Sequence, residues 1–273
     1  SSDLARFTPE EETTLLSLQG EALSIAHEVR LDNLLWDGRS GEARRMLPRV
    51  GPDWRALGAA RIALREMEPN APALVDAVPK SLAADPGLAY ERFVWRMRKD
   101  RYDDAAALIL ATSDSAAHLG RPELWADRRA LLARRLMRTG QPELAYKIAA
   151  AHRLEGGTDY ADLEFLSGFI ALRKLGDPQR ALKHFNHLKN AVATPISLAR
   201  GDYWIARARE AAGDAAGAKA AYQSAARYQT AYYGLLAAEK LGLPLDPKLV
   251  TVGEAGPGWK TSSFASSSVL AAG

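Results

Sequence analysis

A turn followed by a small residue recurs along the chain, and this repeat constrains the fold more than any other feature. At each site a glycine or polar turn precedes an alanine that we place inside a new helix. The last four alanines follow one another at intervals of 36 to 40 residues. That period fits two helices of about a dozen residues each plus their turns. The pairs are Gly38 and Ala43, Asp100-Arg101 and Ala105, Gly140 and Ala145, Gly176 and Ala181, and Gly213 and Ala218.

The segment around Gly176 shows what one repeat contains. Glycine ends a helix without a Cβ penalty, and Asp177 is placed to cap the next helix. Apolar residues then recur at helical spacing, in Ala181, Phe185 and Leu188. A single hairpin of this kind leaves its apolar face uncovered, whereas stacked neighbours cover it. We therefore expect an all-α fold, a superhelical solenoid of stacked antiparallel hairpins, tetratricopeptide-like and curved or U-shaped.

Capping residues followed by proline mark the starts of several expected helices, and the loss of helical periodicity marks the end of the helical region. A capping residue precedes proline in Thr8-Pro9, Asp85-Pro86, Asp177-Pro178 and Thr194-Pro195. The gap of 62 residues between Ala43 and Ala105 leaves room for one degenerate unit near Asn70-Ala71-Pro72-Ala73. Helical periodicity stops at Pro244. We expect a scaffold domain over residues 1–243 and an irregular Pro/Gly/Ser-rich segment over 244–273, the start of a linker domain.

Charge and composition exclude several classes of function. The net charge is only +3, with both signs mixed, which disfavours a nucleic-acid binder. The chain has no cysteine, so disulfides, thiol catalysis and Cys-ligated zinc are excluded. No run of 18 apolar residues is present, and we expect no transmembrane segment. The N-terminus is neither basic nor apolar, so we expect a signal peptide to be absent or removed.

Residue types that can act in catalysis are present, but they do not form a recognisable catalytic or ligand-binding motif. No phosphate-binding loop, dinucleotide fingerprint or nucleophile elbow occurs. His184 and His187 are spaced i, i+3, but a metal site needs a third ligand that this register does not offer. Asp159, Asp162 and Glu164 are assigned to the start of a helix, where negative charge favours the dipole. We predict no catalytic residue, no metal and no cofactor.

Aromatic residues concentrate near the end of the helical region. They either pack between helices, with their hydroxyl groups at the edge, or form a platform for sugar rings or for another domain. The candidate docking or glycan-binding surface consists of Tyr203, Trp204, Tyr228, Tyr232 and Tyr233.

A resemblance to a known family covers residues 8 to 243 and is most specific from Thr158 to Gly242. It rests on Asp159-Tyr160-Ala161-Asp162-Leu163-Glu164, Gly176-Asp177-Pro178, the segment from Thr194 to Trp204, and Tyr232-Tyr233-Gly234 through Gly242. The pattern resembles the α-superhelical domain of the soluble lytic transglycosylases of Gram-negative bacteria. The resemblance implies a periplasmic protein whose parent cleaves peptidoglycan between N-acetylmuramic acid and N-acetylglucosamine, leaving 1,6-anhydro ends. It also implies that the partners are the parent's linker and catalytic domains and the glycan strands of peptidoglycan.

The chain departs from that family at the catalytic motif. The family's lysozyme-like domain uses a glutamate followed by serine, and no Glu-Ser pair occurs in this sequence. We therefore expect a non-catalytic scaffold portion of such a lyase, inactive alone. The alternative is a tetratricopeptide-like adaptor that binds a partner protein in its concave groove.

Overall fold

The computed structural model describes residues 8, 10–11, 13–14, 17–18 and 26–250, apart from the side chains of 248 and 250. The regular secondary structure of these residues is entirely helical, with no strand among them, which confirms the all-α prediction. They divide into two compact units, Ser1–Gly176 and Asp177–Gly273. The expected irregular segment over 244–273 lies largely outside the described residues, and its boundary at Pro244 stays a prediction.

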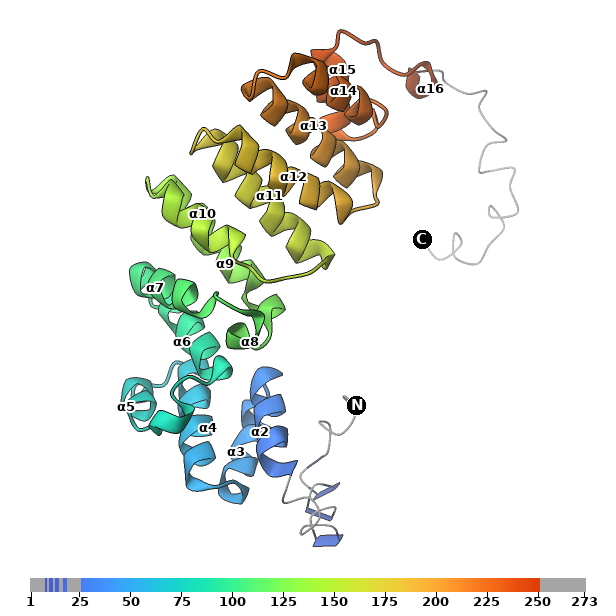
Figure 1. Cartoon of the computed structure of the whole chain (residues 1–273). Helices are drawn as coiled ribbons and strands as arrows, with labels where there is room; N and C mark the ends of the chain where they lie inside the picture. Colours follow the sequence, from blue (N-terminus) through green and yellow to red (C-terminus); the bar gives the residue numbers. More distant parts are fainter. Residues whose placement is uncertain (1–7, 9, 12, 15–16, 19–25, 251–273) are drawn as a thin grey trace, which may run out of the picture. The chain divides into compact units, whose positions relative to one another are not determined.

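The first unit contains a succession of short helices (Figure 1). Consecutive helices pack against each other, as α9 and α10 do, or against the next helix but one, as α4 and α6 do. The helices are α2 (His27–Trp36), α3 (Ser40–Met46), η3 (Leu47–Arg49), α4 (Pro52–Arg65), α5 (Ala71–Asp76), η4 (Lys80–Leu82), α6 (Pro86–Arg98), α7 (Tyr102–Thr112), α8 (Ala116–Leu119), α9 (Pro122–Arg138), α10 (Pro142–Ala150) and α11 (Gly157–Arg173).

The second unit is organised around one long helix. In it, α13 packs against α12, α14 and α15. Its helices are α12 (Pro178–Asn190), α13 (Pro195–Ala211), α14 (Ala215–Ala225), α15 (Tyr232–Lys240) and α16 (Pro247–Val250).

The turns predicted from the repeat are confirmed. Each turn contains one residue with positive φ, and the buried alanine follows five positions later. Four of the turn residues are glycines, whereas Asp100 adopts φ 56° in the fifth. All five alanines are at most 3% exposed, so a larger side chain there would force neighbouring helices apart. The degenerate unit is also present, since Met67 has φ 60° and Ala71 is fully buried.

The predicted caps are confirmed as well. The Asp85 carboxylate accepts a hydrogen bond from the Leu88 amide at 2.7 Å, and Asp177 accepts one from Arg180 at 2.9 Å. Thr194 accepts one from Ser197 at 3.4 Å. At the N-terminus, Thr8 and Glu11 exchange hydrogen bonds in a capping box.

Core residues of the first unit form consecutive clusters, each shared by neighbouring helices. The first cluster joins α2, α3 and α4 around Leu31 and Met46. The next joins α4, α5 and α6 around Leu57 and Leu88. The largest runs from α6 to α11 and contains the fully buried Trp125. Short-range clusters of this kind are what a chain of helical repeats requires.

Candidate functional site

The predicted aromatic residues lie largely together in the second unit. The Tyr203 ring lies 5.3 Å from that of Tyr233 and 5.6 Å from that of Tyr222, measured between centroids. Trp204 is 6.5 Å from Tyr233, and Tyr232 is 5.2 Å from Tyr233. The group therefore links α13, α14 and α15 through ring contacts.

Exposure differs strongly across this aromatic group. Tyr203 is only 7% exposed and belongs to the core, whereas Tyr232 is 68% exposed. Trp204, Tyr228 and Tyr233 are half-buried, and no ring contact among the described residues involves Tyr228. Tyr232 thus presents the one broadly exposed ring of the predicted set. Leu235 on α15, and Leu243 and Leu245 after its end, are each at least 41% exposed and add apolar surface to the unit.

The phenol groups of the buried part are engaged with charged neighbours. The Tyr222 hydroxyl donates to the Glu210 carboxylate at 2.7 Å, and the Tyr203 hydroxyl accepts from Arg207 at 3.3 Å. Burial, reinforced by Glu210, raises the pKa of Tyr222 well above its ordinary value. Tyr222 therefore remains a neutral phenol near neutral pH and donates its hydroxyl proton to the Glu210 hydrogen bond.

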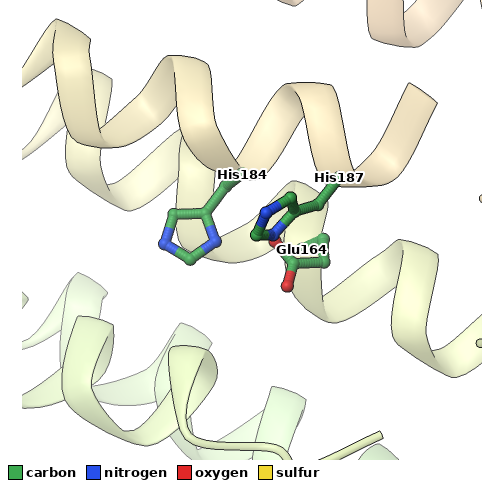
Figure 2. A group of neighbouring side chains, drawn as sticks. All are labelled: Glu164, His184 and His187. Atoms are coloured by element: carbon green, nitrogen blue, oxygen red, sulfur yellow. The ribbon is translucent and has the colours of Figure 1, made fainter. Parts of the chain in front are cut away.

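His184 and His187 both lie on α12 (Figure 2). Their ring centroids are 6.3 Å apart with an interplanar angle of 83°. His184 is buried and His187 half-buried. Among the described residues of the second unit, no Asp, Glu or third His completes a group of three ligands with them. The pair alone does not satisfy the coordination that a stable site requires.

Glu164, the third residue labelled in Figure 2, belongs to α11 of the first unit. Its assignment to the start of a helix, as a dipole-compensating charge, is wrong. Glu164 lies in the middle of α11, is buried, and its Oε1 lies 3.2 Å from Nε2 of His152. The Tyr160 ring packs edge-on against His152 at 5.3 Å. Burial of a carboxylate in this way requires such a partner, and His152 joins α11 to the preceding segment.

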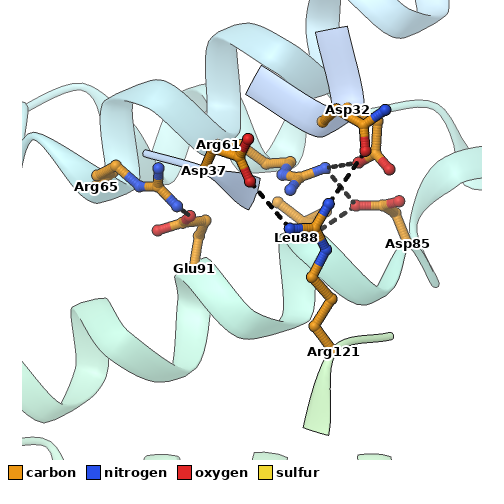
Figure 3. Close-up of polar contacts among 9 residues, drawn as sticks. Asp32, Asp37, Arg61, Arg65, Asp85, Leu88, Glu91 and Arg121 are labelled. Carbon is orange, nitrogen blue, oxygen red and sulfur yellow. Dashed lines mark hydrogen bonds and ion pairs between the residues drawn. The ribbon is translucent and has the colours of Figure 1, made fainter. Parts of the chain in front are cut away.

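A cluster of arginines and carboxylates links α2, α4 and α6 in the first unit (Figure 3). At its centre the fully buried Arg61 donates to Asp32 at 2.6 Å and lies 3.5 Å from Asp85. The Arg61 guanidinium is also 5.1 Å from the centroid of the Trp36 ring. Gly87 makes this arrangement possible, because a Cβ at position 87 would overlap the guanidinium. No local pattern in the sequence identifies this cluster.

Two further ion pairs adjoin the Arg61 cluster. Arg65 pairs with Glu91, which is only 2% exposed, and Arg121 pairs with Asp37 at 3.0 Å. Burial raises the pKa of Glu91 although Arg65 opposes the shift. A buried acid with a raised pKa beside a cavity is the environment that a general acid uses. The cavity next to Glu91 measures about 220 Å³, a little below the usual size of a pocket for a drug-sized ligand.

A second buried guanidinium supports α9. Arg129 is fully buried and donates to the Ile148 carbonyl at 2.7 Å and to Ser113 Oγ at 2.8 Å. The two acceptors lie at the C-terminal ends of α10 and α7, where the helix dipole favours a cation. Burial, together with Arg153, lowers the pKa of Arg129 to about 9, so it stays charged at neutral pH. Its role is structural.

Comparison with known proteins identifies no relative. No family model, no curated protein and no solved structure matches the chain. In the part of the chain that the structure describes, no helix combines the length and apolar character needed to span a bilayer.

Proposed function

We propose that the chain is the non-catalytic scaffold portion of a periplasmic lytic transglycosylase that acts on peptidoglycan. The observation that carries the proposal is the resemblance of residues 158–242 to the α-superhelical domain of that family. The absence of a Glu-Ser pair supports a scaffold in place of a catalytic domain. Glu91, the buried acid beside the cavity of about 220 Å³, is ion-paired with Arg65.

The proposal includes a superhelical stacking of the helical repeats. Its supports are the regular turns, the buried alanine after each of them and the consecutive core clusters of the first unit. In a solenoid each repeat contacts mainly its neighbours, which is the pattern of helix packing found within each unit. A wall of this kind restricts how a polymer approaches a catalytic domain held against it.

The exposed end of the aromatic group is the surface we assign to the parent's linker and catalytic domains or to glycan. Tyr232 is exposed on α15, next to the exposed Leu235. Tyrosine suits either role, since its ring gives apolar contact and its hydroxyl remains hydrated. The buried Tyr203 contributes by holding Tyr233 in place.

The proposed inactivity is tested by incubating the purified chain with insoluble peptidoglycan. Soluble products are then analysed by mass spectrometry for 1,6-anhydromuropeptides. We expect no release above a buffer control, whereas a lysozyme-treated sample shows that the substrate is accessible. Sustained release of anhydro products by this chain would overturn the scaffold assignment.

The alternative is a tetratricopeptide-like adaptor, favoured by a repeat period close to that of such proteins. It predicts a saturable complex with one partner protein and no affinity for glycan. Affinity purification from a periplasmic extract, set beside sedimentation with peptidoglycan, separates the two. Peptidoglycan binding without a stoichiometric protein partner supports the scaffold, and the reverse supports the adaptor.

A further inference from the structure

A small pocket in the first unit is formed where four helices meet. Trp36 comes from the end of α2, Arg65 from α4, Tyr90 from α6 and Arg128 from α9. The cavity has a volume of about 220 Å³. A cavity of this size holds several water molecules or a small organic molecule with one ring. Most of its lining residues belong to helices, whereas Asp37 and Gly38 lie in the turn after α2.

The charges of the lining residues do not balance within the pocket. Glu91 is matched by Arg65, and Asp37 is matched by Arg121. Arg98 also lines the pocket; its Nη1 donates to the backbone carbonyl of Arg65 at 2.8 Å, and its charge opposes the rise that burial causes in the pKa of Glu91. Three arginines therefore line the pocket beside two carboxylates.

Arg128 is the least engaged of these cations. No hydrogen bond or ion pair within the described part of the chain involves its guanidinium, although the side chain is half-buried. The phenol of Tyr90 lies in the field of Arg128, Arg98 and Arg65, each of which opposes the rise that burial causes in its pKa. The hydroxyl of Tyr90 likewise has no hydrogen-bond partner among the described residues.

The remaining wall of the pocket is apolar. Trp36, Val94 and Leu124 line it, and the Trp36 ring is fixed by Tyr90 at 5.6 Å between centroids. A ligand that matches both parts of the lining combines an anionic group for the guanidiniums with an apolar body for this wall. Arginine donors suit oxyanions in particular, because their planar fork matches carboxylate and phosphate geometry.

We propose that this pocket binds the oxyanion group of a small organic anion, with Arg128 and Arg98 as the binding cations and Tyr90 as an additional donor. The ligand class is a carboxylate or phosphate monoester attached to a body of one ring or less. The site is independent of the scaffold function proposed above, since it uses only residues of the first unit.

The test is titration of the full chain with benzoate and with phenyl phosphate, which carry the two oxyanions on the same ring. Benzamide, a neutral molecule of similar shape to benzoate, is the matched ligand control. ¹⁵N–¹H correlation spectra follow the Trp36 indole and the Gly38 amide, both at the pocket. These local signals distinguish binding in the pocket from non-specific binding elsewhere.

We expect at least one anion to saturate these shifts, with dissociation constants near millimolar, while benzamide leaves them unchanged. Tighter binding of benzoate indicates a carboxylate ligand, and tighter binding of phenyl phosphate indicates a phosphate monoester. R128Q should weaken binding about tenfold, the expected effect of losing a charge-assisted hydrogen bond at a partly exposed site.

R134Q is the matched protein control. Arg134 lies on the same helix as Arg128, is exposed and does not line the pocket. Unchanged binding by R134Q, together with weaker binding by R128Q, supports the assignment. Saturation by neither anion, or an equal loss in both variants, overturns it. Because catalysis is not measured, failure here leaves the scaffold proposal untouched.

Discussion

Gly87 offers a sharp test of how the arginine cluster holds the first unit together. It lies in the first turn of α6, and a methyl group on its Cα would overlap the guanidinium of Arg61. That guanidinium has no free space, because it is fully buried and is bonded to Asp32 at 2.6 Å. Gly87→Ala therefore displaces Arg61 from its carboxylates or separates α6 from α4.

Two opposing terms set the size of the effect. Breaking a buried ion pair costs about 3–5 kcal/mol, and the lower end applies here because the Asp32 side chain is 32% exposed. Alanine in place of glycine favours a helix by at most about 1 kcal/mol. The net expectation is a fall of about 2 kcal/mol in the free energy of unfolding.

Urea unfolding followed by tryptophan fluorescence measures this change, since Trp36, Trp54, Trp95 and Trp125 all lie in the first unit. Gly41→Ala is the control, because Gly41 is an exposed helical glycine with open space around it. We expect that variant to be as stable as the wild type or slightly more stable.

A double-mutant cycle with Arg61→Met tests whether the effect depends on the guanidinium. In the Arg61→Met background, Gly87→Ala should lower the free energy of unfolding much less than it does in the wild type. Equal destabilisation by Gly87→Ala in both backgrounds, or stability equal to that of Gly41→Ala, would refute the argument.

Three further predictions concern single residues. Burial raises the pKa of Glu91 above its ordinary 4.5, so the folded state binds the Glu91 proton more tightly than the unfolded state does. The free energy of unfolding should therefore fall as the pH rises from about 4.5 through the raised pKa of the folded state. Glu91→Gln should flatten that slope in urea titrations over this range, and an unchanged slope would contradict the assignment. Tyr222→Phe removes the hydrogen bond to the partly exposed Glu210 and should lower the free energy of unfolding by about 1 kcal/mol in the same assay; no loss would show that the bond is not formed. Arg129→Lys keeps the charge but not the planar fork, and should cost about 2 kcal/mol by losing the contact with Ser113 or with the Ile148 carbonyl; wild-type stability would refute the bidentate role.

The helices, their caps and their turns were predictable because each depends on residues close in sequence. Asp177 caps α12 through an amide three residues away, and Gly176 supplies the preceding turn. Ala181 is buried at the spacing that the repeat fixes. Such local rules do not specify which distant side chains meet.

The residues that the sequence did not reveal all depend on contacts between segments far apart in the chain. Arg61 reaches Asp32 across 29 positions, and nothing near Arg61 marks it as buried. Glu164 looked like a helix-start charge until its position in the middle of α11 and its contact with His152 were known. For the aromatic residues, their concentration near the end of the helical region indicated a common surface, but not that Tyr203 is buried and Tyr232 exposed.

The proposed scaffold role requires that this chain contact peptidoglycan without cutting it. The most direct measurement is the fraction of purified chain that sediments with insoluble peptidoglycan as the protein concentration is raised. We predict saturable sedimentation that weakens when the exposed Tyr232 is replaced by serine, with the folded state unchanged. A chain that remains in the supernatant at every concentration would contradict the account.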